Sequence, residues 1–168
     1  KSYLFAAVGG FSAGILPGSY RFDCDRQSLL GEAIQKSGAV EMPYFSATGT
    51  SDTVVPFINK DNWQKNAFFA AWQIYQIMNG MSVTERPDFS KDTIFGITLE
   101  NRETIWTNKG ISMETGVLSK NGVPLIQMVA VNDYGHWNFK PAAKMMWDYF
   151  MQFSRDPQTK ELIYHGRK

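Results

Sequence analysis

Residues 42–56 read MPYFSATGTSDTVVP, an apolar run that ends in a polar turn. The run 42–49 is bounded by Pro43 and Gly49, which is typical of a short strand buried on both faces. The turn TSDT follows directly, so Asp52 stands at the carboxyl end of the predicted strand.

A second apolar run, VPLIQMVAV at 123–131, also predicts a strand buried on both faces. The pair Asn121-Gly122 precedes it and is typical of a two-residue hairpin turn. The loop NDYGHW at 132–137 follows it, so His136 stands beyond the end of this strand as Asp52 does beyond the first.

Between these two strands, apolar residues recur every three or four positions from Trp63 to Met78 and predict an amphipathic helix. Asp61 can cap this helix, with Gln64 at the reciprocal position of a capping box. Gly80 supplies its end. The other predicted elements are strands at 3–9, 93–99 and 103–107, a short helix at 27–36, and a final helix that starts at Pro141, buries residues through Phe153 and stops at 155–157.

Buried strands that alternate with amphipathic helices indicate an α/β architecture, with a mainly parallel sheet and flanking helices. The 168 residues fit one domain, and 43% hydrophobic with 20% charged residues excludes a disordered chain. No apolar run is long enough to span a membrane. A formal net charge of +1 without a basic stripe argues against nucleic-acid binding. With one cysteine and two histidines, the chain has few of the side chains that usually bind a metal ion.

In open α/β sheets, ligands bind beyond the carboxyl ends of the strands, where Asp52 and His136 are predicted to lie. A neutral imidazole can take a proton from a nucleophile, and it needs a carboxylate on its other ring nitrogen to fix the tautomer. We therefore expect the two side chains within hydrogen-bond reach. The alternatives are a structural histidine and an ordinary turn carboxylate. Trp137 and Phe57 flank the pair and line either a pocket or the core.

Four motifs in sequence order resemble the α/β-hydrolase superfamily, in particular bacterial polyhydroxybutyrate-depolymerase-like and feruloyl-esterase-like enzymes. Residues 49–56 resemble the acid loop G-x-x-D-x-x-V-P, and 135–137 followed by a helix resemble the histidine loop. Residues 146–157 look like the closing helix, and 4–14 look like the strand after the nucleophile helix. The segment 81–122 has no counterpart and is interpreted as a variable, β-rich insertion.

The resemblance implies that 1–168 form the C-terminal part of a three-layer α/β-hydrolase domain that lacks its N-terminal strands. It implies a serine esterase that cleaves small or polymer-linked carboxylic esters, such as hydroxycinnamoyl or short-chain acyl esters, through an acyl-serine. Asp52 would be its acid and His136 its base, and no metal or cofactor is needed. The family resemblance favours a secreted or periplasmic enzyme.

The nucleophile is not evident in the chain. Residues 10–14, GFSAG, match G-x-S-x-G, but Pro17 follows closely and would break the helix that this motif requires. We therefore expect the nucleophilic serine upstream of Lys1, in an N-terminal half of the same enzyme, with Ser12 as the alternative. Other functions left open are a non-catalytic α/β module that binds glycan or peptide, and a serine peptidase of the same fold.

Overall fold

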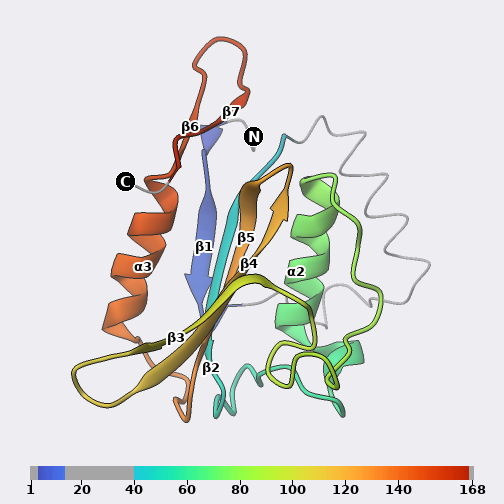
Figure 1. Ribbon diagram of the computed structural model, residues 1–168, viewed down its shortest axis with the longest axis vertical. Coiled ribbons are helices and arrows are strands. Elements are labelled where there is room, and N and C mark those ends of the chain that lie inside the picture. The colour runs from blue at the N-terminus through green and yellow to red at the C-terminus, as the bar shows by residue number, and fades with distance from the viewer. Residues whose placement is uncertain (1–3, 14–39, 167–168) are drawn as a thin grey trace.

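The computed structural model describes residues 4–13 and 40–166 and shows an α/β fold built on one mixed sheet (Figure 1). The sheet order is β1-β2-β5-β4-β3. Its strands are β1 (Val8–Phe11), β2 (Tyr44–Gly49), β3 (Glu100–Trp106), β4 (Ser112–Lys120) and β5 (Val123–Val131). β1, β2 and β5 pair in parallel, whereas β5, β4 and β3 pair antiparallel. The sheet is therefore mixed, because a hairpin extends the parallel part at one edge.

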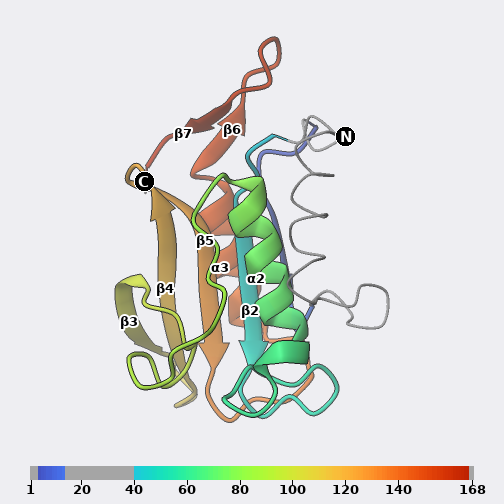
Figure 2. The ribbon, with the colours of Figure 1, turned by 90° about the vertical axis from the view of Figure 1, so that its right-hand side faces the viewer.

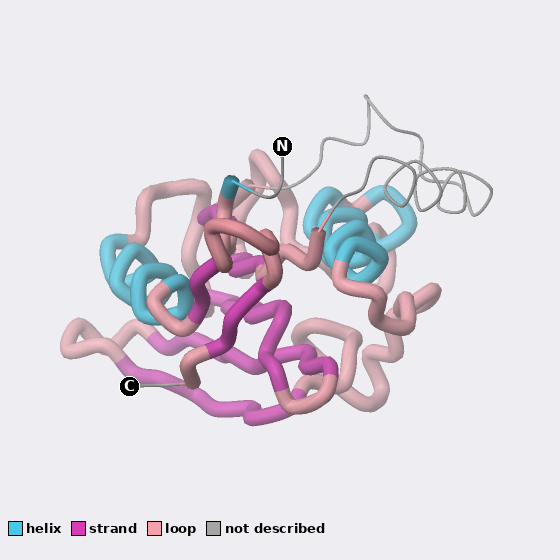
Figure 3. Tube along the Cα trace, turned by 90° about the horizontal axis from the view of Figure 1, so that it is seen from above, coloured by secondary structure: helices cyan, strands magenta, loops and turns pink. Residues whose placement is uncertain are grey.

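Within the described residues, one helix packs against each face of the sheet (Figure 3). α2 (Ala67–Met78) lies along β2 on one face (Figure 2), and α3 (Lys140–Phe150) covers the other. Two apolar clusters fill the spaces between, one with Trp72 and Phe95 and the other with Phe45 and Tyr149. No helix in the described ranges is both long and apolar enough to cross a membrane.

The two predicted central strands are confirmed. All six residues of β2 are buried, and β5 spans the predicted residues. The hairpin turn between β4 and β5 is also present, because Asn121 and Gly122 both take positive φ, 53° and 79°, as a type I′ turn requires.

The predicted helix start at Asp61 is wrong. A short 3-10 helix, η2 (Trp63–Lys65), comes first, and α2 is capped by Asn66. Asn66 has an extended backbone, and its side-chain oxygen accepts from the N–H groups of Phe68 and Phe69 at 3.0 and 3.1 Å. Asp61 bonds only its exposed neighbour Lys60 by its side chain in the described structure.

Two other strand predictions need correction. Residues 93–99 form turns, because Asp92 accepts the N–H groups of Ile94 and Phe95 and breaks the extended backbone. Their alternating apolar side chains fill the core beside α2 without joining the sheet. β1 begins at Val8 and runs through Phe11, later than predicted, and its residue Gly9 lies against β2 where a Cβ would come within 2.8 Å of the Phe45 carbonyl oxygen.

The final helix ends at Phe150, before the predicted end at Phe153. Phe153 instead opens β6 (Phe153–Arg155), which pairs with β7 (Leu162–Tyr164) in a hairpin that projects from the sheet (Figure 1). Phe153 is buried in the α3 cluster, and the Arg155 guanidinium donates to the carbonyl oxygens of Phe5, Glu41 and Lys160. These contacts fix the segment as a strand. The predicted helix at 27–36 lies outside the described residues.

Candidate active site

Asp52 lies in the loop that follows β2, and its side chain has no exposed surface. One carboxylate oxygen, Oδ1, accepts from the backbone N–H groups of Val54 and Val55, both at 2.9 Å. The loop folds back because the Asp52 N–H donates to the Gly49 carbonyl at 3.3 Å. Asp52 is therefore held by the backbone of its own loop, and its second oxygen, Oδ2, is free to meet another group.

That group is His136, 84 positions further along the chain. His136 Nδ1 lies 2.8 Å from Asp52 Oδ2, so the predicted contact is present. An ionised carboxylate only accepts hydrogen bonds, so Nδ1 carries the proton and Nε2 of the neutral ring keeps its lone pair. The His136 side chain is 39% exposed, whereas Asp52 is buried. The pair thus joins a buried acid to a base that solvent can reach.

The backbones of the two loops are bonded directly to each other. The Thr50 N–H donates to the Val131 carbonyl at 2.9 Å and the Ser51 N–H to the Tyr134 carbonyl at 3.0 Å. The Asp133 N–H donates to the Thr50 hydroxyl at 2.9 Å. Two of these hydrogen bonds join the acid loop, 49–56, to the histidine loop, 132–138, and the third ties the acid loop to the last residue of β5.

Gly49 makes this close approach possible. A Cβ at this position would lie 2.0 Å from the Tyr134 carbonyl oxygen and 2.9 Å from the Gly135 oxygen. No side chain fits there, so only glycine lets the histidine loop pass over the end of β2. The sequence offered a signal for this role, because a glycine within a buried strand often marks a close approach of another backbone.

The pKa of Asp52 lies below its ordinary value of 3.8. Burial raises it, but the hydrogen bonds from Val55, His136 and Val54, together with the nearby Ser12 hydroxyl, outweigh that effect. These donors all favour the charged form. Asp52 is therefore ionised at neutral pH and can stabilise a proton on His136.

Ser12 lies at the end of β1 and does not contact His136. Its φ is 48°, in the left-handed region, and its N–H extends the β1–β2 ladder by donating to the Ala47 carbonyl at 2.8 Å. The side-chain oxygen is buried and has no hydrogen-bond partner. A nucleophile must reach His136 Nε2, so Ser12 does not fit that role in this arrangement.

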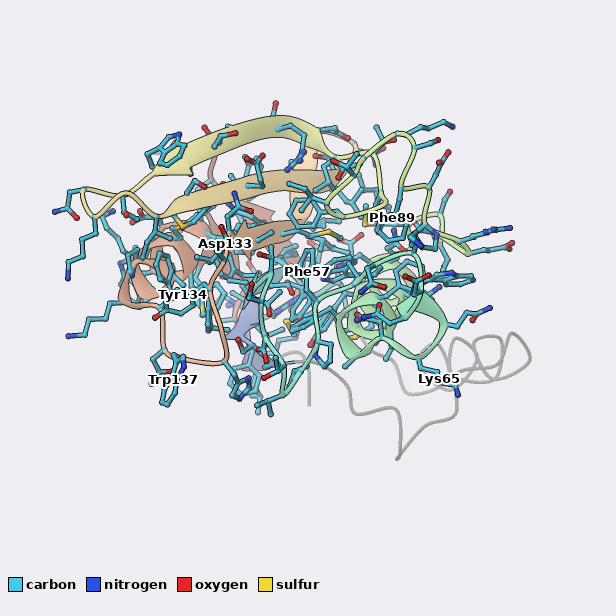
Figure 4. The ribbon with its side chains drawn as sticks, turned by 90° about the horizontal axis from the view of Figure 1, so that it is seen from below. Phe57, Lys65, Phe89, Asp133, Tyr134 and Trp137 are labelled. Atoms are coloured by element: carbon cyan, nitrogen blue, oxygen red, sulfur yellow. The ribbon has the colours of Figure 1, made fainter. Side chains whose placement is uncertain are left out.

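The surroundings of the pair are partly apolar. Trp137 is 76% exposed and stands out from the histidine loop beyond Tyr134 and Asp133 (Figure 4), and Val54 is 67% exposed. Phe57 is buried in the α2 cluster and belongs to the core. A hollow of about 410 Å³ lies beside Val54–Pro56 and the start of α2, and neither Asp52 nor His136 lines it.

Within residues 4–13 and 40–166, no group of three or more His, Cys, Asp or Glu side chains could hold a metal ion. The chemistry that these residues can perform is proton transfer by His136, oriented by Asp52. Searches with models of known protein families and against curated proteins found no match to this chain.

Proposed function

We propose that this protein is a carboxylic-ester hydrolase of the α/β-hydrolase type, in which the chain supplies Asp52 as the acid and His136 as the base. The observation that carries the proposal is the 2.8 Å contact between Asp52 Oδ2 and His136 Nδ1, at the carboxyl ends of two parallel strands. The acid precedes the histidine in the chain, as in this fold.

In the proposed reaction, His136 Nε2 removes the proton of a serine hydroxyl while the serine oxygen attacks the ester carbonyl. The imidazolium that forms keeps its Nδ1–H bond to the ionised Asp52, and Nε2–H then protonates the leaving alcohol. Water attacks the acyl-serine in the same way and releases the acid. Asp52 remains ionised throughout, which agrees with its low pKa and three hydrogen bonds.

We assign the nucleophile to a segment N-terminal to Lys1, because Ser12 has a buried oxygen and no contact with His136. Among the described strands, β1 pairs only with β2, so its other edge can accept a further parallel strand. A strand added there would end at the same edge of the sheet as β2 and β5. A nucleophile at its end would therefore reach the site from the side of β1.

We further propose that the ester carries an apolar or aryl group. Trp137 and Val54 are exposed directly beside the two site residues, and neither packs into a core cluster. Exposed aromatic surface next to a reactive centre suits a hydroxycinnamoyl or acyl chain.

The test measures hydrolysis of p-nitrophenyl acetate and of methyl ferulate by the protein with all sequence that precedes Lys1 in its gene. We expect turnover, loss of at least ~10²-fold in kcat for His136→Ala, and covalent labelling by a serine-reactive phosphonate. His165→Ala is the matched control, because His165 bonds Ser154 on the projecting hairpin away from the site.

Mass spectrometry of the labelled protein locates the serine. Label on a serine before Lys1 supports the proposal, and label on Ser12 would reassign the nucleophile. If the protein shows neither turnover nor labelling while the Asp52–His136 contact is intact, the result would favour a binding module.

A further inference from the structure

A hollow of about 550 Å³, here called the polar hollow, lies on the α3 side of the sheet. Its lining includes Glu100 and Glu103 of β3, Gln127 of β5, and Tyr149 and Gln152 at the end of α3. None of its lining residues belongs to the acid loop or the histidine loop. Figure 1 shows the β4–β5 turn and the end of α3 at the far end of the sheet from those loops. A cavity of this size suits a small molecule.

A β-bulge turns two glutamates toward the polar hollow. Glu100 pairs with Val117 and Glu103 with Thr115, so three steps along β3 match two steps along β4. Side chains alternate between the faces of a strand, so without the bulge the two glutamates would lie on opposite faces. Asn101 lies within the bulge with a φ of 50°, which asparagine tolerates better than most residues. The irregular backbone therefore brings both carboxylates to one face.

These two carboxylates carry no counter-charge within the described residues. Neither Glu100 nor Glu103 forms an ion pair or a side-chain hydrogen bond there. Arg102 also lines the polar hollow, but its guanidinium is engaged elsewhere. Its Nε lies 3.1 Å from Asp92 and its Nη2 lies 3.6 Å from Glu114. The described lining therefore presents two negative charges that a cationic ligand can neutralise.

Two buried amides add hydrogen-bond acceptors to the same hollow. Gln127 and Gln152 are each 7% exposed, and both line it. Gln152 Oε1 has no hydrogen-bond partner, while Gln152 Nε2 donates to the Asp148 carbonyl at 3.3 Å. Gln127 Nε2 donates to Thr115 Oγ1, also at 3.3 Å, and its Oε1 receives no described donor. A buried acceptor without a partner costs free energy, so these amides favour a ligand that brings N–H donors.

We propose that the polar hollow binds a small aliphatic diamine. Val117 and Thr115 are two residues apart, which places Glu100 and Glu103 about 7 Å apart along the strand direction. One ammonium group would meet each carboxylate across such a span. An ammonium donates hydrogen bonds and accepts none, so its remaining N–H groups suit the free amide oxygens. The rings of Tyr149 and Tyr164, which also line the hollow, suit the methylene chain and the cations.

The first test measures putrescine binding to the whole protein by isothermal titration calorimetry. Glu100→Gln and Glu103→Gln should each weaken binding by about 3–10-fold, because each removes one charged partner. Glu85→Gln is the matched control, because Glu85 is exposed and lies outside the hollow. It removes the same charge and should leave the affinity unchanged. The diol with the same carbon chain should not bind, because it carries no charge.

Gln152→Met separates ligand binding from plain stability. Methionine has a similar unbranched shape but lacks the unpaired oxygen. Loss of the long bond to Asp148 is offset by removal of that oxygen, so we expect a Tm within about 2 °C of wild type. Putrescine should nevertheless bind more weakly. A lower Tm with unchanged affinity would assign Gln152 to the fold alone and overturn its part in the site.

NMR locates the ligand. The side-chain N–H2 resonances of Gln127 and Gln152 should shift during the putrescine titration, with the same Kd as calorimetry. Absence of putrescine binding, or equal weakening by Glu85→Gln and the two hollow variants, would overturn the proposal. Neither measurement uses an ester, so the result is independent of the proposed hydrolase activity.

Discussion

Gly49→Ala is expected to separate the acid from the base with a single methyl group. The new Cβ would lie 2.0 Å from the Tyr134 carbonyl oxygen, and real contacts of this kind are at least 3.0 Å. The histidine loop must therefore move by at least 1.0 Å. This displacement stretches the Ser51–Tyr134 hydrogen bond from 3.0 Å toward 4.0 Å, beyond a bonding distance.

The cost follows from those contacts. Overpacking of this kind destabilises a protein by about 1–3 kcal/mol, and one lost backbone bond adds about 1 kcal/mol. We expect Gly49→Ala to lower the free energy of unfolding by about 2–4 kcal/mol, measured with urea. His136 lies two residues after Tyr134, and a 1 Å misplacement can cost ~10²-fold in rate. The ester assay should show a loss of that order, and the His136 Nδ1 proton should lose its downfield shift.

Gly135→Ala is the matched control. It makes the same chemical change in the partner loop, but its Cβ would meet only the Trp137 ring, at 3.6 and 3.8 Å, which is ordinary contact. We expect a change within about 0.5 kcal/mol. Wild-type stability in Gly49→Ala, or equal damage from Gly135→Ala, would refute the reasoning, because the close contact would then not hold the loops together.

Four further variants test the acid and the two ends of α2. Asp52 has a lowered pKa, so its contribution to the free energy of unfolding is fully present above pH 3.8 and is lost as the pH falls through the folded-state pKa. We therefore expect Asp52→Asn to be less stable than wild type at pH 7, and urea titrations in acid should show a smaller difference between the two. Asn79→Ala should cost about 2–4 kcal/mol in urea unfolding, because the fully buried Asn79 amide bonds both backbone groups of Met42, at 2.7 and 3.0 Å. Asn66→Ala removes the N-cap of α2 and should lower the free energy of unfolding by about 0.5–2 kcal/mol. Asp61→Ala should change it by no more than about 0.5 kcal/mol. Equal effects of the two substitutions would show that Asp61 is also a cap.

The sequence alone predicts those strands and turns that depend on the chemistry of neighbouring residues. Continuous apolar runs predict β2 and β5, because both strands are buried on both faces. Asn121-Gly122 predicts its turn, because both residues tolerate positive φ. Asp52 and His136 could be predicted as a pair for the same reason, since each lies in the loop that follows one of these strands.

Other features depend on contacts that no local pattern records. Residues 93–99 alternate like a strand, but their apolar side chains fill the core from turns. The predicted strand at 3–9 stops at Gly9, yet β1 continues through Phe11, and Gly9 permits close packing on Phe45. Gln73 and Gln76 look like the polar face of α2, but both are buried because they bond the segment at Thr84.

The position of the site follows from the parallel pairing of β2 and β5 more than from either loop. Gly49 and Val131 are in register as the last residues of their strands, so the two loops begin at the same level. The Thr50–Val131 hydrogen bond extends that ladder by one residue into the acid loop. A slip of one residue would move a loop by about 3.3 Å along the sheet, more than the 2.8 Å contact could survive. The antiparallel strand β4 holds the histidine loop from its other side, because the Asn132 N–H donates to the Ser112 carbonyl and the Asn132 side-chain amide donates to the Ser112 hydroxyl, each at 2.9 Å. The mixed sheet therefore supports the Asp52–His136 pair through both neighbours of β5.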